Sequence, residues 1–480
     1  MSIDSTRSVR TPAVLEQLQK SDPHRRVLVR GATIISMDPN VGDLPRGDLL
    51  IEGSRIAAVA PDLSQAARDG QAIVVEAGGM IAIPGLQDAH RHSWQTQMRR
   101  LLPDCDLPEY VGLLHAQLAP AYRPRDMYLG NQLAALTALQ SGVTSLLDFS
   151  HNRRTAEHCD AAAQAWLDSG IRATFVPVAP LFGDWDGRWR QDLRRLRDTT
   201  FASDDQLVRM RVGAYTPSVP DLVVGDLKVT AGTVELAQDL GLGISVDAVF
   251  GDDCSTHIEQ LAADGVLSPD MTFIHCTRLS AATWDGLASA GCKVVLAATS
   301  DMLLGTEDAL PPIQEALDRG IEPGLSIDVE CCLSSDIYTQ MRTVMSVQRM
   351  GAYARRRAAE ADAPAPLAAR DALRLATIAG AEANGWGGVV GTLTPGMQAD
   401  VVLIRADDVD NLPLNNAVAT VVLGTDSSNV DTVFVAGRPR KWAGDLVDVD
   451  LPALTQEVEA SRDWLLEQVG REVDICGSSL

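Results

Sequence analysis

The stretch IPGLQDAHRHSWQTQMRR, residues 83–100, follows a short apolar run and contains two histidines, His90 and His92, separated by one residue. Alternate side chains on an extended strand point to the same face, so we expect both imidazoles on one side of the strand end. Neutral imidazole is a common ligand for transition metals. Surface pairs of this kind are also common, so the rest of the chain has to decide between a metal site and a chance pair.

From residue 80 to residue 328 the chain alternates short apolar runs with segments of helical pattern. Continuous apolar strands that alternate with helices are typical of a parallel sheet covered on both faces. Eight such runs fit a closed (β/α)8 barrel, and the absence of a glycine-rich phosphate loop after any run disfavours an open doubly wound sheet. The runs are MIAIPGL (80–86), TSLLDF (144–149), RATFVPVAP (172–180), RMRVGAYT (209–216), GISVDAVF (243–250), MTFIHC (271–276), KVVLAA (293–298) and PGLSID (323–328).

Shorter β-rich patterns with Gly and Pro punctuation flank this repeat on both sides, and we expect them to pair with each other. The predicted fold class is therefore α/β: a TIM-like (β/α)8 barrel plus a small composite β-sandwich domain built from both chain ends. The predicted boundaries are an N-terminal arm (1–26), the first sandwich half (27–80), the catalytic barrel (81–388), the second sandwich half (389–445) and a C-terminal helical tail (446–480).

The charge balance argues against two classes of partner. The 480 residues include 41 Lys and Arg and 64 Asp and Glu, which gives a net charge of -23. A surface of this sign repels phosphate backbones and anionic lipids, so we expect neither nucleic acid nor membrane as a partner. The eight cysteines form no C-x-x-C pair, and no signal peptide or transmembrane run is evident, which predicts a reduced, cytoplasmic protein.

Polar residues stand at the ends of several predicted strands. His90 and His92 follow the first strand, Asp247 lies in the fifth, His275 ends the sixth and Asp328 ends the eighth. Chemistry in such a barrel sits at the carboxyl ends of the strands, and converging His and carboxylate groups are what a divalent cation requires. Each also has an ordinary structural reading, since a strand-end His bonds backbone carbonyls and a strand-end Asp caps helices.

These motifs resemble the amidohydrolase superfamily. PGLQDAHRH (84–92) resembles its P-G-[LF]-[IV]-[ND]-x-H-x-H signature, while GDLLIEGSRIAAV (47–59) and GTLTPGMQADVVLI (391–404) are similar to its two β-sandwich halves. SGVTSLLDF (141–149), FIHCTRLS (273–280) and DALPPIQEALDRGIEPGLSID (308–328) resemble the branch that contains cytosine deaminase, guanine deaminase and the triazine hydrolases. The similarity covers about residues 27–440.

The resemblance implies roles for individual residues. His90 and His92 match metal ligands, and Asp328 matches the aspartate that binds metal and takes the proton of the attacking water. His275 matches the histidine that polarises the substrate or bonds the nucleophilic water. No Lys lies near the end of the fourth strand, so a single metal ion is expected rather than a lysine-bridged pair.

The chain departs from this branch at the fifth strand. Asp247 stands where the branch has a histidine ligand, and Phe250 stands where it has the glutamate that shuttles protons in deamination. The usual Pro-His after the fourth strand is also missing from GAYTPSV (213–219). We expect Asp247 to point into the site and to substitute for the histidine, because a buried carboxylate needs a cation or several hydrogen bonds. The alternative is a protonated or water-bonded aspartate that binds a substrate cation.

Four further residues are candidates for substrate binding: Trp94, Gln97, Arg99 and His151. The first three follow the His-x-His pair, and His151 follows the second strand. For Trp94 and Arg99, packing against a helix is an equally good explanation. For His151, the alternative is a loop side chain that is simply exposed to solvent.

The leading hypothesis is a metal-dependent hydrolase of a small, neutral or cationic, ring-containing substrate, cleaving a C–N bond, or a C–S or C–halogen bond, with metal-activated water. The cofactor would be one divalent ion, zinc before manganese, cobalt or iron. One alternative is a metal-free lyase, isomerase or ring-modifying enzyme that uses His275 and the aspartates as acid and base. Another is a non-catalytic binding protein. By analogy with the family we expect a homo-oligomer, a dimer or higher.

Overall fold

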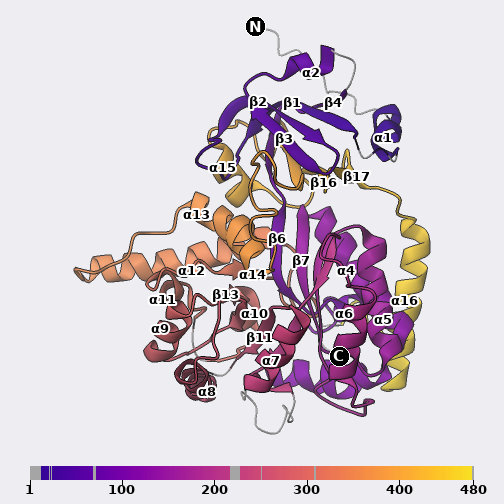
Figure 1. Cartoon of the computed structure of the whole chain (residues 1–480), viewed down its shortest axis with the longest axis vertical. Coiled ribbons are helices and arrows are strands. Elements are labelled where there is room, and N and C mark those ends of the chain that lie inside the picture. The colour runs from indigo at the N-terminus through magenta and orange to yellow at the C-terminus, as the bar shows by residue number, and fades with distance from the viewer. Residues whose placement is uncertain are drawn as a thin grey trace.

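The computed structural model describes residues 12–20, 22, 24–68, 72–216, 227–249, 251–307 and 310–477. Strands alternate with helices through most of this length, so the α/β class is confirmed (Figure 1). Phe250 and the segment after the fourth predicted strand, 217–226, lie outside the described residues. None of the helices within these ranges is both long and apolar enough to cross a bilayer.

Strands from both ends of the chain pair in one nine-stranded sheet, in the order β18-β17-β16-β15-β5-β1-β2-β3, with β4 beside β1. The two ends meet where β5 pairs antiparallel with β15. These strands are β1 (Arg26–Ile34), β2 (Leu44–Glu52), β3 (Arg55–Ala60), β4 (Ala72–Glu76), β5 (Met80–Pro84), β15 (Val401–Arg405), β16 (Val430–Val435), β17 (Arg438–Trp442) and β18 (Asp445–Leu446).

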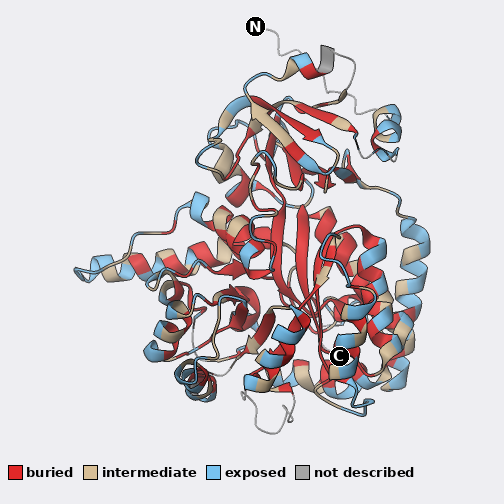
Figure 2. Cartoon of the chain, viewed as in Figure 1, coloured by how far each residue is buried: buried red, intermediate tan, exposed pale blue. Residues whose placement is uncertain are grey.

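The middle of the chain forms two parallel sheets, one of four strands and one of five. The four-stranded sheet contains β6 (Leu86–Arg91), β7 (Val143–Ser150), β8 (Arg172–Pro177) and β9 (Val208–Met210). The five-stranded sheet contains β10 (Val212–Tyr215), β11 (Ile244–Ala248), β12 (Met271–His275), β13 (Lys293–Leu296) and β14 (Gly324–Leu325). Every residue of β6, β7, β8 and β12 is buried, as expected for parallel strands covered on both faces (Figure 2).

Backbone contacts connect the two parallel sheets at both of their edges. Only Arg211 separates β9 from β10 along the chain. At the other edges, Arg91 and Asp328 form a parallel bridge, and the amide of His92 donates to the carbonyl of Asp328 at 2.9 Å. The ends of β6 and β14 are therefore held side by side.

Helices surround the parallel strands, with their exposed faces outward (Figures 1 and 2). The helices that follow the strands are α3 (Leu107–Tyr110), α4 (Pro124–Gln140), α5 (Ala156–Ser169), α6 (Trp189–Asp198), α7 (Ala231–Leu240), α8 (Gly251–Ala263), α9 (Ala281–Ser289), α10 (Ala298–Leu303), α11 (Ile313–Leu317), α12 (Ile337–Arg357), α13 (Ala369–Arg374) and α14 (Gly380–Ala383). The 3₁₀ and π segments are η1 (Ser93–Met98), η2 (Val111–Leu118), η3 (Ala119–Ala121), η5 (Leu375–Ala379) and η6 (Thr420–Gly424). The remaining helices are α1 (Pro12–Gln19), α2 (Ser64–Arg68), α15 (Ala417–Ala419) and α16 (Leu451–Gln468).

The structure differs from the sequence prediction in the first run, 80–86. This run is split between two sheets, because β5 belongs to the sheet of the chain ends and β6 begins after Gly85. A side chain at Gly85 would collide with Thr144 at the start of β7, so the chain passes from one sheet to the other only with a glycine at this crossing. The first strand of the parallel sheets is therefore 86–91, which carries His90.

Candidate functional site

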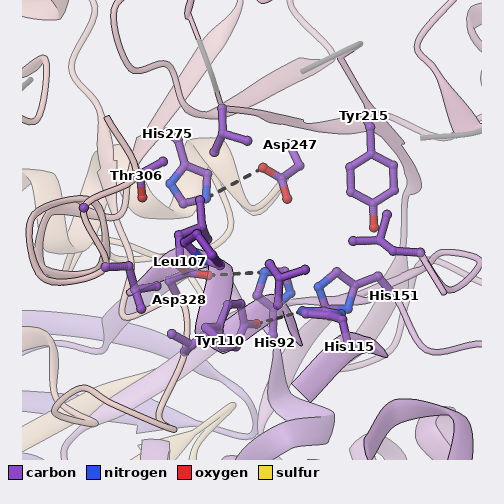
Figure 3. A pocket seen from close by; sticks show the side chains of 17 residues that line it. His92, Leu107, Tyr110, His115, His151, Tyr215, Asp247, His275, Thr306 and Asp328 are labelled. Atoms are coloured by element: carbon purple, nitrogen blue, oxygen red, sulfur yellow. Dashed lines mark hydrogen bonds and ion pairs between the residues drawn. The ribbon is translucent and has the colours of Figure 1, made fainter. Parts of the chain in front are cut away.

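Five predicted residues lie together at the carboxyl ends of the parallel strands, and Figure 3 shows four of them, His92, Asp247, His275 and Asp328. His90 belongs to β6, and His92 follows that strand directly. Asp247 is near the end of β11, His275 ends β12, and Asp328 follows β14. The Nε2 atoms of His90 and His92 lie 3.2 and 3.3 Å from Oδ1 of Asp328, and Nε2 of His275 lies 3.7 Å from Oδ1 of Asp247.

These side chains form two overlapping groups that could hold a metal ion, His90 with His92 and Asp328, and His90 with Asp247 and His275. In each group the candidate ligand atoms lie within 4.8 Å of one another. Both ring nitrogens of His90 and one oxygen each of Asp247 and Asp328 are buried without a hydrogen-bond partner among the described residues. Buried polar atoms are normally satisfied, so this set fits a divalent cation of the zinc type.

Neighbouring groups fix which ring nitrogen of two histidines faces the site. Nδ1 of His92 lies 3.0 Å from the carbonyl oxygen of Phe149, which can only accept, so Nδ1 carries the proton and Nε2 is left with a lone pair. Nδ1 of His275 lies 2.8 Å from Oδ1 of Asp301 and donates to it. Partners of this kind orient imidazoles and raise their basicity.

The helix α10, which follows β13, contributes two residues that hydrogen-bond to side chains of the site. Ser300 donates its hydroxyl to Oδ2 of Asp328 at 2.6 Å, and Asp301 accepts from His275. Burial alone would lower the pKa of His275, but the carboxylates of Asp301 and Asp247 raise it to about 10. Burial alone would raise the pKa of Asp328, but the imidazoles of His90, 3.2 Å away, and of His92 keep it below its usual value.

Two of the site residues have unusual backbone conformations. His275 has a φ of 66° and Asp328 a φ of 62°, in the left-handed region that non-glycine residues rarely adopt. Such conformations persist where the surrounding structure enforces them, and they concentrate at functional sites. The backbone amide of Asp328 donates to the carbonyl of His90 at 3.2 Å, which ties this residue to β6.

A cavity of about 480 Å³ is lined by four of the five residues, all except His90, and its size is within the range of small-molecule sites. Its polar lining is His92, Tyr110, His115, His151, Tyr215, Asp247, His275, Thr306 and Asp328 (Figure 3). Its apolar lining is Leu107, Pro108, Val111, Leu181, Val249, Leu304 and Val329.

The four predicted substrate-binding residues have different positions. His151 lines the cavity, while Trp94 is fully buried behind it and donates Nε1–H to Nδ1 of His151 at 2.9 Å. Gln97 and Arg99 do not line the cavity. The amide of Gln97 donates to the carbonyl of Asp126 at 3.1 Å, and Arg99 pairs with Glu330 at 3.0 Å. The structure therefore brings one of the four into contact with the cavity.

Sequence reasoning missed several residues of the site. Ser300 and Asp301 follow the seventh strand, where the rule that polar groups gather at strand ends would have found them. Tyr215 ends β10 and is detectable in the same way. His115 comes from η2, about 25 residues beyond His90, and no sequence signal marks it.

Comparisons with known proteins find sequence similarity along most of the chain. A sequence profile of the amidohydrolase family matches residues 234–440. A 5'-deoxyadenosine deaminase from Methanosarcina barkeri is 26% identical over 464 residues, which cover 92% of this chain and 99% of that protein. A 5-methylthioadenosine/S-adenosylhomocysteine deaminase from Pelotomaculum thermopropionicum is 26% identical over 90% of this chain and 97% of its own length.

Solved structures show the same fold. An adenosine deaminase from Xanthomonas campestris with bound zinc superposes with a TM-score of 0.76 at 21% identity, covering 93% of this chain and 99% of that one. An atrazine chlorohydrolase mutant from Arthrobacter aurescens, complexed with zinc and atraton, gives a TM-score of 0.74 at 24% identity, with coverage of 91% and 99%. A family profile matches residues 234–440 and deaminase relatives align along nearly the whole chain, so this protein is similar in sequence and in fold to the amidohydrolases.

Proposed function

We propose that this protein is a metal-dependent hydrolase that uses water to cleave a C–N bond of a small, ring-containing substrate. C–S and C–halogen bonds are the other bonds that fit. The observation that carries the proposal is the convergence of His90, His92 and Asp328 beneath the cavity, with buried atoms that lack hydrogen-bond partners. Relatives are named as deaminases of adenosine derivatives, and a structural neighbour is named as an atrazine chlorohydrolase.

His90, His92, Asp247 and Asp328 would hold one divalent ion, zinc before manganese, cobalt or iron. When bound, such an ion lowers the pKa of water and polarises the bond that is attacked. The candidate set comprises two neutral imidazoles and two carboxylates. Burial lowers the pKa of both His90 and His92, which keeps their rings neutral and able to ligate.

Asp328 and His275 divide the proton transfers in this proposal. Oδ1 of Asp328 has no hydrogen-bond donor among the described residues, so it can accept the proton of the attacking water. The bond from Ser300 to Oδ2 keeps the carboxylate in this orientation. His275 is held by Asp301 through Nδ1, so its Nε2–H can donate to the leaving group or to the substrate. This assigns to His275 the role that a glutamate has in the related branch, where this chain has Phe250.

We also infer that the two parallel sheets are halves of one (β/α)8 barrel. The support is the bridge between Arg91 and Asp328 at one pair of edges and the single residue between β9 and β10 at the other. The nine-stranded sheet would be the core of the composite β-sandwich domain. The predicted domain boundaries, the homo-oligomeric state and the cytoplasmic location stay predictions from the sequence.

Metal analysis of the purified protein tests the proposal directly. We expect about one divalent ion per chain, loss of hydrolysis on chelation, and recovery with zinc, manganese or cobalt. His90→Ala and His92→Ala should each lose the ion, while His158→Ala, a control at a buried histidine that does not line the cavity, should keep it. A chain without bound metal, or activity that survives chelation, would contradict the proposal.

Heavy-oxygen water separates hydrolysis from the metal-free alternative. A hydrolase must incorporate one solvent oxygen into the product, whereas a lyase or isomerase using His275 as acid and base incorporates none. We expect incorporation, and its absence in an active preparation would favour the alternative.

A further inference from the structure

Two hydrogen-bonding groups on one side of the cavity take no part in the proposed metal site. His151 and Tyr215 lie together in Figure 3, away from His275 and Asp328, and the hydroxyl of Tyr215 points toward His151. Both residues line the cavity, and both are nearly fully buried, with exposures of 3% and 4%. The Tyr215 hydroxyl has no hydrogen-bond partner among the described residues.

The hydrogen bond from Trp94 determines the protonation state of His151. An indole Nε1–H can only donate, so Nδ1 of His151, 2.9 Å away, has to accept and carries no proton. A ring with an unprotonated Nδ1 is neutral, and its single proton is on Nε2.

The neighbours of Trp94 and His151 keep this arrangement fixed. Trp94 is fully buried and packs edge-on against Tyr122, with ring centroids 4.8 Å apart. The ring of His151 stacks on His92 at 3.9 Å, with 11° between the planes. The stacking holds the plane of the His151 ring, and a 180° flip within that plane would put a carbon where Nδ1 lies and lose the bond from Trp94.

We propose that His151 presents a fixed Nε2–H donor to the substrate and, together with the Tyr215 hydroxyl, selects neutral ring compounds that carry a hydrogen-bond acceptor at that edge. The acceptor is an unprotonated ring nitrogen or a carbonyl oxygen. The proposal rests on the proposed function only in taking this cavity as the substrate site.

The surroundings of His151 and Tyr215 disfavour an anionic group at this edge. No Lys, Arg or Glu is present among the described residues that line the cavity, and His275, whose pKa is raised to about 10, lies away from these two residues (Figure 3), so an anion here would find no adjacent positive side chain to offset its desolvation. A cation at this edge would face the Nε2–H of His151, which can only donate, and would have the hydroxyl oxygen of Tyr215 alone as an acceptor from this pair. A ring without an acceptor would leave the His151 and Tyr215 donors buried and unpaired, which costs binding free energy.

Three probes of nearly the same shape test the ligand class: quinoline, naphthalene and N-methylquinolinium. They offer a neutral acceptor, no acceptor and a positive charge at the same position. We expect calorimetry with the purified protein to show quinoline binding about tenfold more tightly than naphthalene, the typical loss when a buried donor is left unpaired. N-methylquinolinium should bind no better than naphthalene. Equal binding of all three probes, tighter binding of the cation, or no binding of any would overturn the proposal.

Variants separate the donor from other causes of a quinoline preference. In His151→Phe the ring remains but the donor is gone, so the preference for quinoline should fall to about twofold or less. A preference that persists in this variant, as expected if the ring nitrogen binds a metal instead, would contradict the role of His151.

NMR of protein labelled with ¹⁵N-histidine tests the fixed proton independently of any ligand. We expect His151 to show a protonated Nε2 and an unprotonated Nδ1, and Trp94→Phe to release this preference. Trp166→Phe is the matched control, because Trp166 is equally buried and donates its Nε1–H to Asp148 at 3.0 Å, so it should leave the His151 signals unchanged. A doubly protonated ring, or a proton on Nδ1, in the unmodified protein would overturn the proposal. None of these measurements uses turnover, so their failure is distinguishable from a failure to find hydrolysis.

Discussion

At the scale of single residues, Asp247 is the departure from the family that matters most for the metal. It is half-buried in the cavity lining, and its Oδ1 has no hydrogen-bond partner among the described residues. Asp247→Asn keeps the shape and removes the charge, so we expect metal affinity to fall at least tenfold if this side chain ligates. Competition with a chromogenic chelator measures the change, with Asp168→Asn on the exposed face of α5 as control.

The same variant distinguishes the other roles of Asp247. Retained metal with lost turnover would instead make Asp247 a substrate-binding residue. Unchanged metal content together with unchanged activity would show that Asp247 has neither role.

Asp301 contacts His275, and we expect it to influence the reaction through that histidine. Its Oδ1 accepts from Nδ1 of His275 at 2.8 Å, and it is 1% exposed. In Asp301→Asn the partner of the imidazole loses its charge, so we expect kcat to fall about 10- to 100-fold while the metal is retained. Turnover and metal content measured on one preparation check this, and loss of the metal would instead assign His275 to the ligands.

At the scale of elements, the approach of α4 to η1 supports the segment that follows His92. The two elements are in contact, and a side chain at Gly130 of α4 would lie against the Trp94 carbonyl and 2.5 Å from Oε1 of Gln97. We therefore expect Gly130→Ala to lower the free energy of unfolding by about 1–3 kcal/mol, although alanine normally favours a helix.

Gly351 provides the matched control for this prediction. It lies in α12, where a new side chain would meet nothing within 4 Å. Gly351→Ala should raise the free energy of unfolding by about 0.5–1 kcal/mol through helix propensity alone. Urea unfolding of both variants measures the changes, and shifts of the same sign would show that the contact with η1 is not tight.

At the scale of the whole molecule, buried charges connect the sheet of the chain ends to the parallel strands. Arg172 of β8 pairs with Asp400 at 2.9 Å, and Nζ of Lys441 on β17 donates to the carbonyl of Gln140 at the end of α4 at 2.8 Å. Burial lowers the pKa of Lys441 from 10.5 to about 8. The folded protein therefore releases this proton at a lower pH than the unfolded chain does.

This difference predicts a pH dependence of stability. Between pH 8 and pH 10.5 the unfolded state binds more protons at Lys441 than the folded state, so this residue makes the free energy of unfolding rise with pH in that window. Lys441→Met removes the contribution, and the difference between the two proteins should grow across the window in favour of the unmodified chain. A difference that does not change with pH would contradict the shifted pKa.

The sequence by itself determined the class of the fold and the general position of the site. Apolar runs such as TSLLDF (144–149) are buried along their whole length, and burial on both faces of parallel strands is visible as an uninterrupted apolar pattern. The end of a strand can also be recognised from neighbouring residues in the sequence. For this reason five residues could be predicted to lie together at the carboxyl ends of the strands: His90, His92, Asp247, His275 and Asp328. The split of the run 80–86 was not predictable, because the approach of Thr144 to Gly85 involves residues 59 positions apart.

Only the folded structure shows which side chains hold His275, Asp328 and His151 in place. Asp301 and Ser300 reach His275 and Asp328 across 26 and 28 residues, and Trp94 reaches His151 across 57. Whether a polar side chain lines a cavity, as His151 does, or bonds a distant backbone, as Gln97 does, depends on packing between elements. A pattern within one strand or helix carries information about the face on which a side chain lies. The partner that the side chain meets there is set by long-range packing, because it comes from another part of the chain.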